Sequence, residues 1–199
     1  MSVSTIIFDL GGVLLNWQPH RVWSPELGEA EARAFMDRIN FPALNVRADG
    51  GESFADLAKE IEDPADAERF LAYPSLFGRA VEGGIPGMWE LLDMLVAQGT
   101  PLHAITNFPA ECWTAAVTAH PQLGTSFGEI FVSGREGIMK PDERAFQRLL
   151  DRAGVAAADC LFIDDSAKNV EAAAALGLSA HHFQGAEPLR ADLTARGLL

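Results

Sequence analysis

Short apolar segments alternate with helix-like segments along most of this 199-residue chain, and this alternation restricts the fold more than any other feature. Helix-like segments that end on glycine lie at 86–99, 142–154 and 167–177, the first with Pro86 just inside its start. Strands that are joined by helices run parallel, so the sequence predicts a doubly wound parallel α/β sheet. The predicted strands are 4–8, 102–106, 129–133, 160–164 and 179–183.

One long stretch interrupts the alternation. Residues 16–84 contain no segment with the pattern of a strand, but they contain helix-like segments at 26–39, 53–62 and 66–79. The sequence GGIPG at 83–87 then leads back to the alternating pattern. We therefore predict an α/β core domain made of 1–15 and 85–199, with an inserted helical domain at 16–84.

The composition is that of a globular protein with an acidic surface. Hydrophobic residues make up 48% of the chain and charged residues 22%, and the formal net charge is −13. Such a charge argues against nucleic acid and anionic membranes as partners. No apolar run is long enough to span a bilayer and the first residues lack a secretory signal, so we expect a cytoplasmic protein. The sequence leaves open whether it is a monomer or a homodimer.

Polar side chains occur where the predicted strands end. The carboxyl ends of parallel strands meet at one edge of a sheet, and ligands bind there. We therefore expect three carboxylates, a hydroxyl, an amide and an ammonium group to surround one small volume. They belong to Asp9, Thr106, Asn107, Lys140, Asp164 and Asp165.

Each of these residues also has a purely structural interpretation. Asp165 would serve as a helix N-cap, and Thr106 and Asn107 as turn formers. Lys140 would be a solvated loop lysine. The set as a whole favours a functional interpretation, because three carboxylates at one sheet edge repel one another and a divalent cation relieves that repulsion.

These residue types suit phosphoryl transfer. Oxygen ligands select a hard cation, and we predict Mg²⁺. A carboxylate beside Mg²⁺, facing a lysine and a helix N-terminus, is arranged to hold a phosphoryl group. Asp9 would then be the nucleophile and would form an aspartyl-phosphate that water hydrolyses. Gly11 and Gly12 would let the backbone turn sharply and approach the phosphate and the metal.

Four motifs, FDLGGVL, ITN, GIMKPD and FIDDSAKN, resemble in order the motifs of the haloacid dehalogenase (HAD) superfamily of hydrolases. The resemblance covers essentially the whole chain. It implies a Rossmann-like HAD core, and it identifies 16–84 as similar to the family's type 1 helical cap domain.

The resemblance also implies roles for individual residues. Asp9 would be nucleophile and metal ligand, and Lys140 would stabilise the nucleophile and the transferring phosphoryl group. Asp165 would be the principal metal ligand of the fourth motif, with Asp164 binding directly or through water. The backbone carbonyl of Gly11 would serve the metal. The phosphate binders would be Thr106 and Asn107, and Asn169 would have only an outer role.

The first motif departs from the usual phosphatase pattern at Gly11. Phosphatases of the family usually carry an aspartate there, which protonates the leaving group and then activates water. Losing such a group costs ~10²- to 10⁴-fold in rate. The first motif looks most like the FDLG subgroup, which includes glucose-1-phosphate phosphatases. We therefore predict a phosphatase for a small, sugar phosphate-like metabolite with a good leaving group.

Two alternatives remain open. The 2-haloacid dehalogenases of the family also lack that aspartate, but they need no metal, which would leave the repulsion between Asp164 and Asp165 unrelieved. A HAD fold that has lost efficient catalysis would serve as a binding protein. In the cap, Arg47 is expected in a loop before a helix, where it would pair with a second anionic group of the substrate. Further cap candidates are Asn16, Trp17 and His20.

Overall fold

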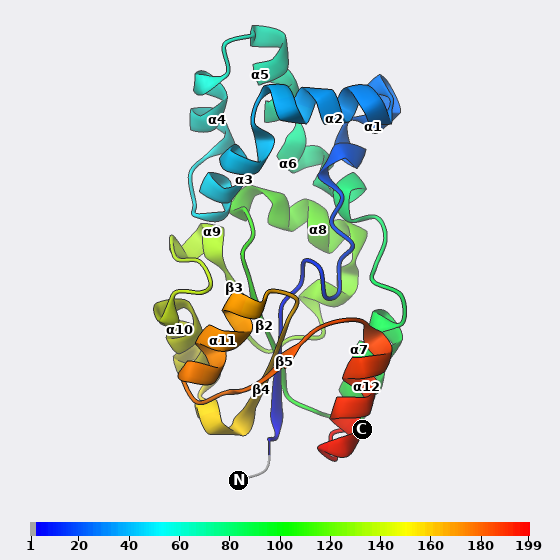
Figure 1. The fold of residues 1–199 in the computed structure, drawn as a ribbon, viewed down its shortest axis with the longest axis vertical. Helices are drawn as coiled ribbons and strands as arrows, with labels where there is room; N and C mark the ends of the chain where they lie inside the picture. Colours follow the sequence, from blue (N-terminus) through cyan, green and yellow to red (C-terminus); the bar gives the residue numbers. More distant parts are fainter. Residues whose placement is uncertain (1–2) are drawn as a thin grey trace.

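A five-stranded parallel sheet organises one end of the molecule (Figure 1). The computed structural model describes residues 3–199, and its strand order is β3-β2-β1-β4-β5 with every neighbouring pair parallel. Each strand agrees with a predicted segment to within one residue at both ends, so the predicted doubly wound sheet is confirmed. The strands are β1 (Thr5–Phe8), β2 (Leu102–Thr106), β3 (Ile130–Val132), β4 (Cys160–Asp164) and β5 (Ser179–His182).

Helices cover both faces of the sheet, because successive strand residues point to opposite sides and both sides are apolar. Ile7 and Phe162 belong to a core on one face with Phe146 of α10, whereas Ile6 belongs to the core on the other face with Leu91 of α7. Figure 1 shows α7 and α12 on one side of the sheet and α10 and α11 on the other. Their bounds are α7 (Met88–Ala97), α10 (Glu143–Ala153), α11 (Ala167–Ala175) and α12 (Ala186–Ala195).

Local signals set the ends of these helices. The Asp142 carboxylate caps α10 by accepting from the Arg144 N–H at 2.9 Å, and Gly154 ends the helix with φ +67°. The start of α7 differs from the prediction. Gly87, at φ +78°, is the residue before the helix, so Pro86 lies outside the first turn.

The residues between β1 and α7 form helices that lie beyond the carboxyl ends of the strands, in the upper part of Figure 1. The α-helices there are α1 (Ser24–Leu27), α2 (Glu29–Arg38), α3 (Phe41–Asp49), α4 (Phe54–Leu57), α5 (Pro64–Leu71) and α6 (Tyr73–Leu76). The 3₁₀ helices are η1 (Pro19–Val22), η2 (Ala58–Glu60) and η3 (Phe77–Val81). After β2 and β3 the chain adds η4 (Ala110–Cys112), α8 (Trp113–Ala119), η5 (Pro121–Gly124), α9 (Ser133–Glu136) and η6 (Ala157–Asp159).

Two features of this helical region differ from the sequence-based expectations. Gly28, at φ +79°, splits the predicted helix at 26–39 into α1 and α2. The stretch around Arg47 is helix α3 and not a loop. Phe41, Leu44 and Ala48 form its buried face, with the i, i+3 and i+7 spacing of a helix that covers a core.

An aromatic cluster fixes the position of α3. Phe41 of α3 lies edge-on to Tyr73, with ring centroids 5.0 Å apart, and to Trp23, with centroids 5.6 Å apart. Tyr73 also stacks on Trp23 and on Phe54. Buried aromatic pairs of this kind contribute both through burial and through ring geometry. They hold α3 in one orientation above the sheet.

The two connections between the helical region and the sheet run together. Leu15 forms an isolated bridge with Gly84, and the Asn16 N–H donates to the Gly83 carbonyl at 2.9 Å. These two connecting segments lie at the predicted boundary between core and cap. The division into two domains stays a prediction. No helix within residues 3–199 has the length and apolar character needed to cross a bilayer.

Candidate active site

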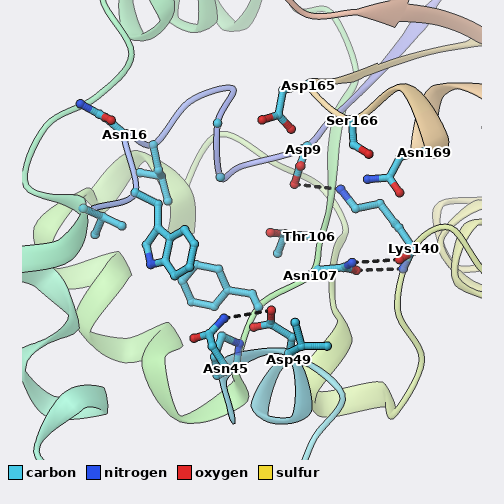
Figure 2. A pocket seen from close by; sticks show the side chains of 18 of the residues that line it. Asp9, Asn16, Asn45, Asp49, Thr106, Asn107, Lys140, Asp165, Ser166 and Asn169 are labelled. Atoms are coloured by element: carbon cyan, nitrogen blue, oxygen red, sulfur yellow. Dashed lines mark hydrogen bonds and ion pairs between the residues drawn. The ribbon is translucent and has the colours of Figure 1, made fainter. Parts of the chain in front are cut away.

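A pocket of about 800 Å³ lies between the carboxyl ends of the strands and helix α3 (Figure 2). Asp9 follows β1, Thr106 ends β2, and Asp165 follows β4, so the sheet brings together residues far apart in sequence. The predicted residues that line it are Asp9, Gly11, Gly12, Thr106, Asn107, Lys140 and Asp165. The opposite wall comes from the helical region and includes Trp17, Asn45, Val46, Asp49 and Phe77.

Lys140 is the buried cation of this pocket. Its ammonium Nζ lies 2.9 Å from Asp9 Oδ1 and 2.7 Å from Asp164 Oδ2, and the residue is only 4% exposed. A lysine is held in such a place only when it is paired, because an isolated buried charge costs several kcal/mol, on the order of 3–5. The interpretation of Lys140 as a solvated loop lysine is therefore wrong.

Asn107 positions Lys140. Its Oδ1 accepts from the Lys140 N–H at 2.8 Å, and its Nδ2 donates to the Lys140 carbonyl at 2.9 Å. The Asn107 side chain is thus engaged by the Lys140 backbone, and phosphate binding by the Asn107 region, which also lines the pocket, stays a prediction. Thr106 is buried at the end of β2, and its hydroxyl lies beside the pocket near Asp9 in Figure 2.

The adjacent acids Asp164 and Asp165 differ in their surroundings. Asp164 is fully buried, and its oxygens accept from Lys140 Nζ, from the Ser166 N–H and from Asn169 Nδ2. Asp165 is an exposed residue, and within residues 3–199 no other residue forms a hydrogen bond or an ion pair with its carboxylate. Asn169 thus contacts Asp164 at the border of the pocket, and its outer role stays a prediction.

The carboxylates at the sheet edge are electrostatically crowded. Burial raises the pKa of Asp9 to about 7; Lys140 opposes this shift and the Asp164 charge adds to it. Although Asp165 is an exposed residue, partial burial of its carboxylate and the Asp164 charge also raise its pKa. Oxygen atoms of Asp9, Asp164 and Asp165 lie within 4.8 Å of one another. An oxygen-only donor set with uncompensated negative charge fits a hard divalent cation.

Gly11 and Gly12 follow β1 in sequence but differ in whether the structure requires glycine at their position. Gly12 has φ +75°, and a Cβ at this position would collide with the Asp165 carboxylate. No heavy atom lies within 4 Å of a Cβ built at Gly11. Only Gly12 is therefore required by the turn, whereas the space beside Gly11 would admit the aspartate that phosphatases of the family usually carry.

Arg47 does not reach the pocket, and its prediction as a substrate-binding residue is wrong. Helix α3 directs its guanidinium to the outer surface, where it pairs with Glu52 and with Glu60. It borders a separate surface hollow beside η2. Of the other cap candidates, Asn16 and Trp17 line the pocket, but His20 contacts Arg33 instead.

Asn45 and Asp49 line the pocket, and the sequence analysis missed both. They lie one helical turn apart on α3, with Asn45 Nδ2 donating to Asp49 Oδ2 at 3.1 Å. The buried atoms Asn45 Oδ1 and Asp49 Oδ1 have no hydrogen-bond partner. Their i, i+4 spacing was a detectable signal, but it has meaning only once α3 is known to be a helix.

The comparisons with known proteins agree with this fold. The model of the haloacid dehalogenase-like hydrolases matches residues 3–177. A sesquiterpene phosphatase of Aspergillus oryzae is 29% identical over 180 residues, covering 89% of this chain and 88% of that protein. The flavin mononucleotide hydrolase 1 of Arabidopsis thaliana is 33% identical over 114 residues, covering 57% of this chain and 46% of that protein. The chain thus spans less than half the length of this plant relative.

Solved structures of the same fold extend the agreement. A HAD family enzyme of Bacteroides thetaiotaomicron, solved as a magnesium complex, superposes with a TM-score of 0.72 at 18% identity, covering 93% of this chain and 95% of that one. The Rossmann-like sheet and the family match over residues 3–177 point to the same family. The chain belongs to the haloacid dehalogenase-like hydrolases, and it is a hydrolase.

Proposed function

We propose that this hydrolase is an Mg²⁺-dependent phosphatase that acts on a small phosphorylated metabolite and uses Asp9 as its nucleophile. The observation that carries this proposal is the difference in hydrogen bonding between the Asp164 and Asp165 carboxylates. Asp164 accepts hydrogen bonds from Lys140, Ser166 and Asn169, whereas the Asp165 carboxylate faces the pocket and no other residue of 3–199 is its partner. A dehalogenase without a metal would have no use for this free carboxylate.

Mg²⁺ would be held by Asp9, Asp165 and the Gly11 carbonyl, with Asp164 binding directly or through water. When bound, it would neutralise charge on the phosphoryl oxygens and relieve the repulsion among the carboxylates. Lys140 holds Asp9 Oδ1 and stabilises the Asp9 carboxylate in its charged form, and Oδ2 is left for attack on phosphorus. The Thr106 hydroxyl at the end of β2 would donate to a phosphoryl oxygen.

The leaving group would lie against the helical wall. That wall carries the aromatic rings of Trp17 and Phe77 next to Asn16 and Asn45, so it suits a compact group with one apolar face and some hydrogen-bonding groups, such as a sugar. The two relatives named above are by name a sesquiterpene phosphatase and a flavin mononucleotide hydrolase, which supports the reaction class.

The test is phosphate release from p-nitrophenyl phosphate and from a set of sugar phosphates, with Mg²⁺ and with EDTA. We expect release with Mg²⁺, its loss in EDTA, and its return when excess Mg²⁺ is added. Halide release from 2-chloropropionate in EDTA, without phosphatase activity in Mg²⁺, would replace the proposal by a dehalogenase. Mg²⁺ binding without either activity would identify a binding protein.

The Gly12→Ala variant tests the metal site. Its Cβ would displace the Asp165 carboxylate and would strain a backbone held at φ +75°. We expect the Mg²⁺ dissociation constant, measured by titration calorimetry, to rise by about tenfold or more, which is the size of effect seen when metal-site supports are removed. The matched control is Gly83→Ala, because its Cβ also meets open space and the residue does not line the pocket. Equal Mg²⁺ affinity in the two variants would contradict the assignment of Asp165 as a metal ligand.

A further inference from the structure

Helix α3 brings a carboxyl group to the pocket from outside the sheet edge. Asp49 lies in the last turn of α3, and Figure 2 shows its side chain on the other side of the pocket from Asp165 and Ser166. The sheet edge itself offers no acid for a leaving group, because Gly11 has no side chain and Asp164 is occupied by Lys140. Asp49 thus lines the pocket but lies apart from Asp9, Asp164 and Asp165, the carboxylates at the sheet edge.

The immediate surroundings of Asp49 are apolar or neutral. One oxygen accepts from Asn45 Nδ2 at 3.1 Å, and the other is buried with no hydrogen-bond partner. A buried oxygen without a partner costs free energy unless a proton or a ligand satisfies it. Burial, reinforced by the charge of Asp9, raises the pKa of Asp49 to about 7. The carboxyl group therefore holds a proton to far higher pH than an ordinary aspartate.

The charged groups on the elements packed against α3 are engaged elsewhere. On α9, Arg135 lies over the Trp113 ring and Glu136 pairs with Arg148 and Arg152. On α2, Arg38 pairs with Asp66. On α4 and η2 the side chains of Asp56 and Lys59 pair with each other, and Arg47 on α3 itself pairs with Glu52 and Glu60. The remaining charge that acts on Asp49 is that of Asp9, across the pocket.

We propose that Asp49 is the general acid and base of this hydrolase, supplied by helix α3 in place of the side chain that Gly11 lacks. This inference rests on the proposed phosphatase function. An in-line displacement places the leaving oxygen on the side of the phosphorus opposite Asp9, and that side faces the helical wall. A carboxyl group on α3 meets the leaving group there.

The two chemical steps balance with Asp49 as the proton carrier. In the first, Asp9 Oδ2 forms a bond to phosphorus, the bond from phosphorus to the leaving oxygen breaks, and that oxygen takes the proton of Asp49. In the second, the Asp49 carboxylate takes a proton from water while the water oxygen bonds to phosphorus and the bond to Asp9 breaks. Inorganic phosphate, the Asp9 carboxylate and protonated Asp49 result. With Asp49 as the acid, the hydrolase would also act on substrates whose leaving group must be protonated as it departs.

The test is the dependence of the rate on the leaving group. Asp49→Asn keeps the size of the side chain but cannot supply a proton. We expect kcat/KM for phenyl and alkyl phosphates to fall by about 10²- to 10⁴-fold. For 2,4-dinitrophenyl phosphate, whose leaving group needs no proton, we expect the first step, measured as a burst of dinitrophenol, to change by less than about threefold. The matched control is Asp56→Asn, a surface acid of the same helical region, and both substrates should be unaffected.

A second readout is the pH profile. With alkyl phosphates the wild-type pH profile should have a rising limb from ionisation of Asp9 and a declining limb from loss of the Asp49 proton, and only the declining limb should be absent in Asp49→Asn. The added substitution Gly11→Asp should restore activity on alkyl phosphates in the Asp49→Asn variant, because open space surrounds that position.

The outcomes separate this inference from the proposed function. Equal losses on phenyl and dinitrophenyl phosphates, or a rise in KM alone, would make Asp49 a positioning residue and overturn the assignment, while the phosphatase function would stand. No phosphate release by the wild-type protein from any of these substrates would overturn the phosphatase function itself.

Discussion

Asp9→Asn is expected to abolish phosphate release, with a loss on the order of 10⁴-fold or more, because an amide cannot attack phosphorus as a carboxylate does. The loss should be the same for good and poor leaving groups, since the variant cannot begin either reaction. Acid quenching during turnover, followed by intact mass spectrometry, should detect phosphorylated wild-type protein and no phosphorylated variant.

The stability of Asp9→Asn provides the control. Burial raises the pKa of Asp9 to about 7, so the charge of this residue reduces the free energy of unfolding as pH rises from the unfolded-state pKa of 3.8 towards 7. A neutral asparagine removes that cost, and Lys140 keeps its partner Asp164. At pH 8 in EDTA the variant should therefore be at least as stable as the wild type in urea denaturation. An inactive variant that is also markedly less stable would leave Asp9 as a structural residue only.

Lys140→Met is expected to damage both folding and activity. Without the ammonium group, Asp9 and Asp164 remain buried next to each other with no counter-charge, and removing one partner of a buried ion pair costs about 3–5 kcal/mol. The loss should be largest at pH 8 and smaller at pH 5, because Asp9, whose pKa burial raises to about 7, is protonated at pH 5 and no longer repels Asp164. Activity should fall by about 10²- to 10³-fold, as when one transition-state donor is removed.

Urea denaturation at both pH values checks this prediction. The matched control is Lys59→Met, an exposed lysine whose ion pair with Asp56 should contribute at most about 1 kcal/mol. Added Mg²⁺ should recover part of the stability that Lys140→Met loses, because a cation at the sheet edge supplies positive charge. Similar losses in the two variants would show that Lys140 lacks the buried electrostatic role that its distances indicate.

The sequence was sufficient for the sheet and for its polar edge. The strands are short, apolar and separated by helices, and the apolar pattern of a strand is a local property. Asp9, Thr106 and Asp165 each lie at the carboxyl end of a strand. A parallel sheet places these ends at one edge, so the three residues come together whatever segments lie between them.

The helical region could be predicted only in outline. Its helices are short and are interrupted by glycine and proline, so periodicity identified some of them and missed α3. In a loop, Arg47 would be a free cation near the substrate, and the i, i+4 spacing of Asn45 and Asp49 would have no structural meaning. In the helix, Arg47 points outward and Asp49 faces the pocket, because positions on a helix diverge by 100° per residue.

Sequence patterns alone predict which acids and which lysine stand at the strand ends, and they show that Gly11 lacks the usual acid. The folded chain adds the roles of those groups: Asp164 and Asn107 hold Lys140, the Asp165 carboxylate faces the pocket, and α3 brings a carboxyl group to the opposite wall. The two kinds of information differ because strand ends are aligned by local pattern and sheet geometry. The approach of α3 depends instead on contacts among Trp23, Phe41 and Tyr73, which only the packed aromatic cluster creates.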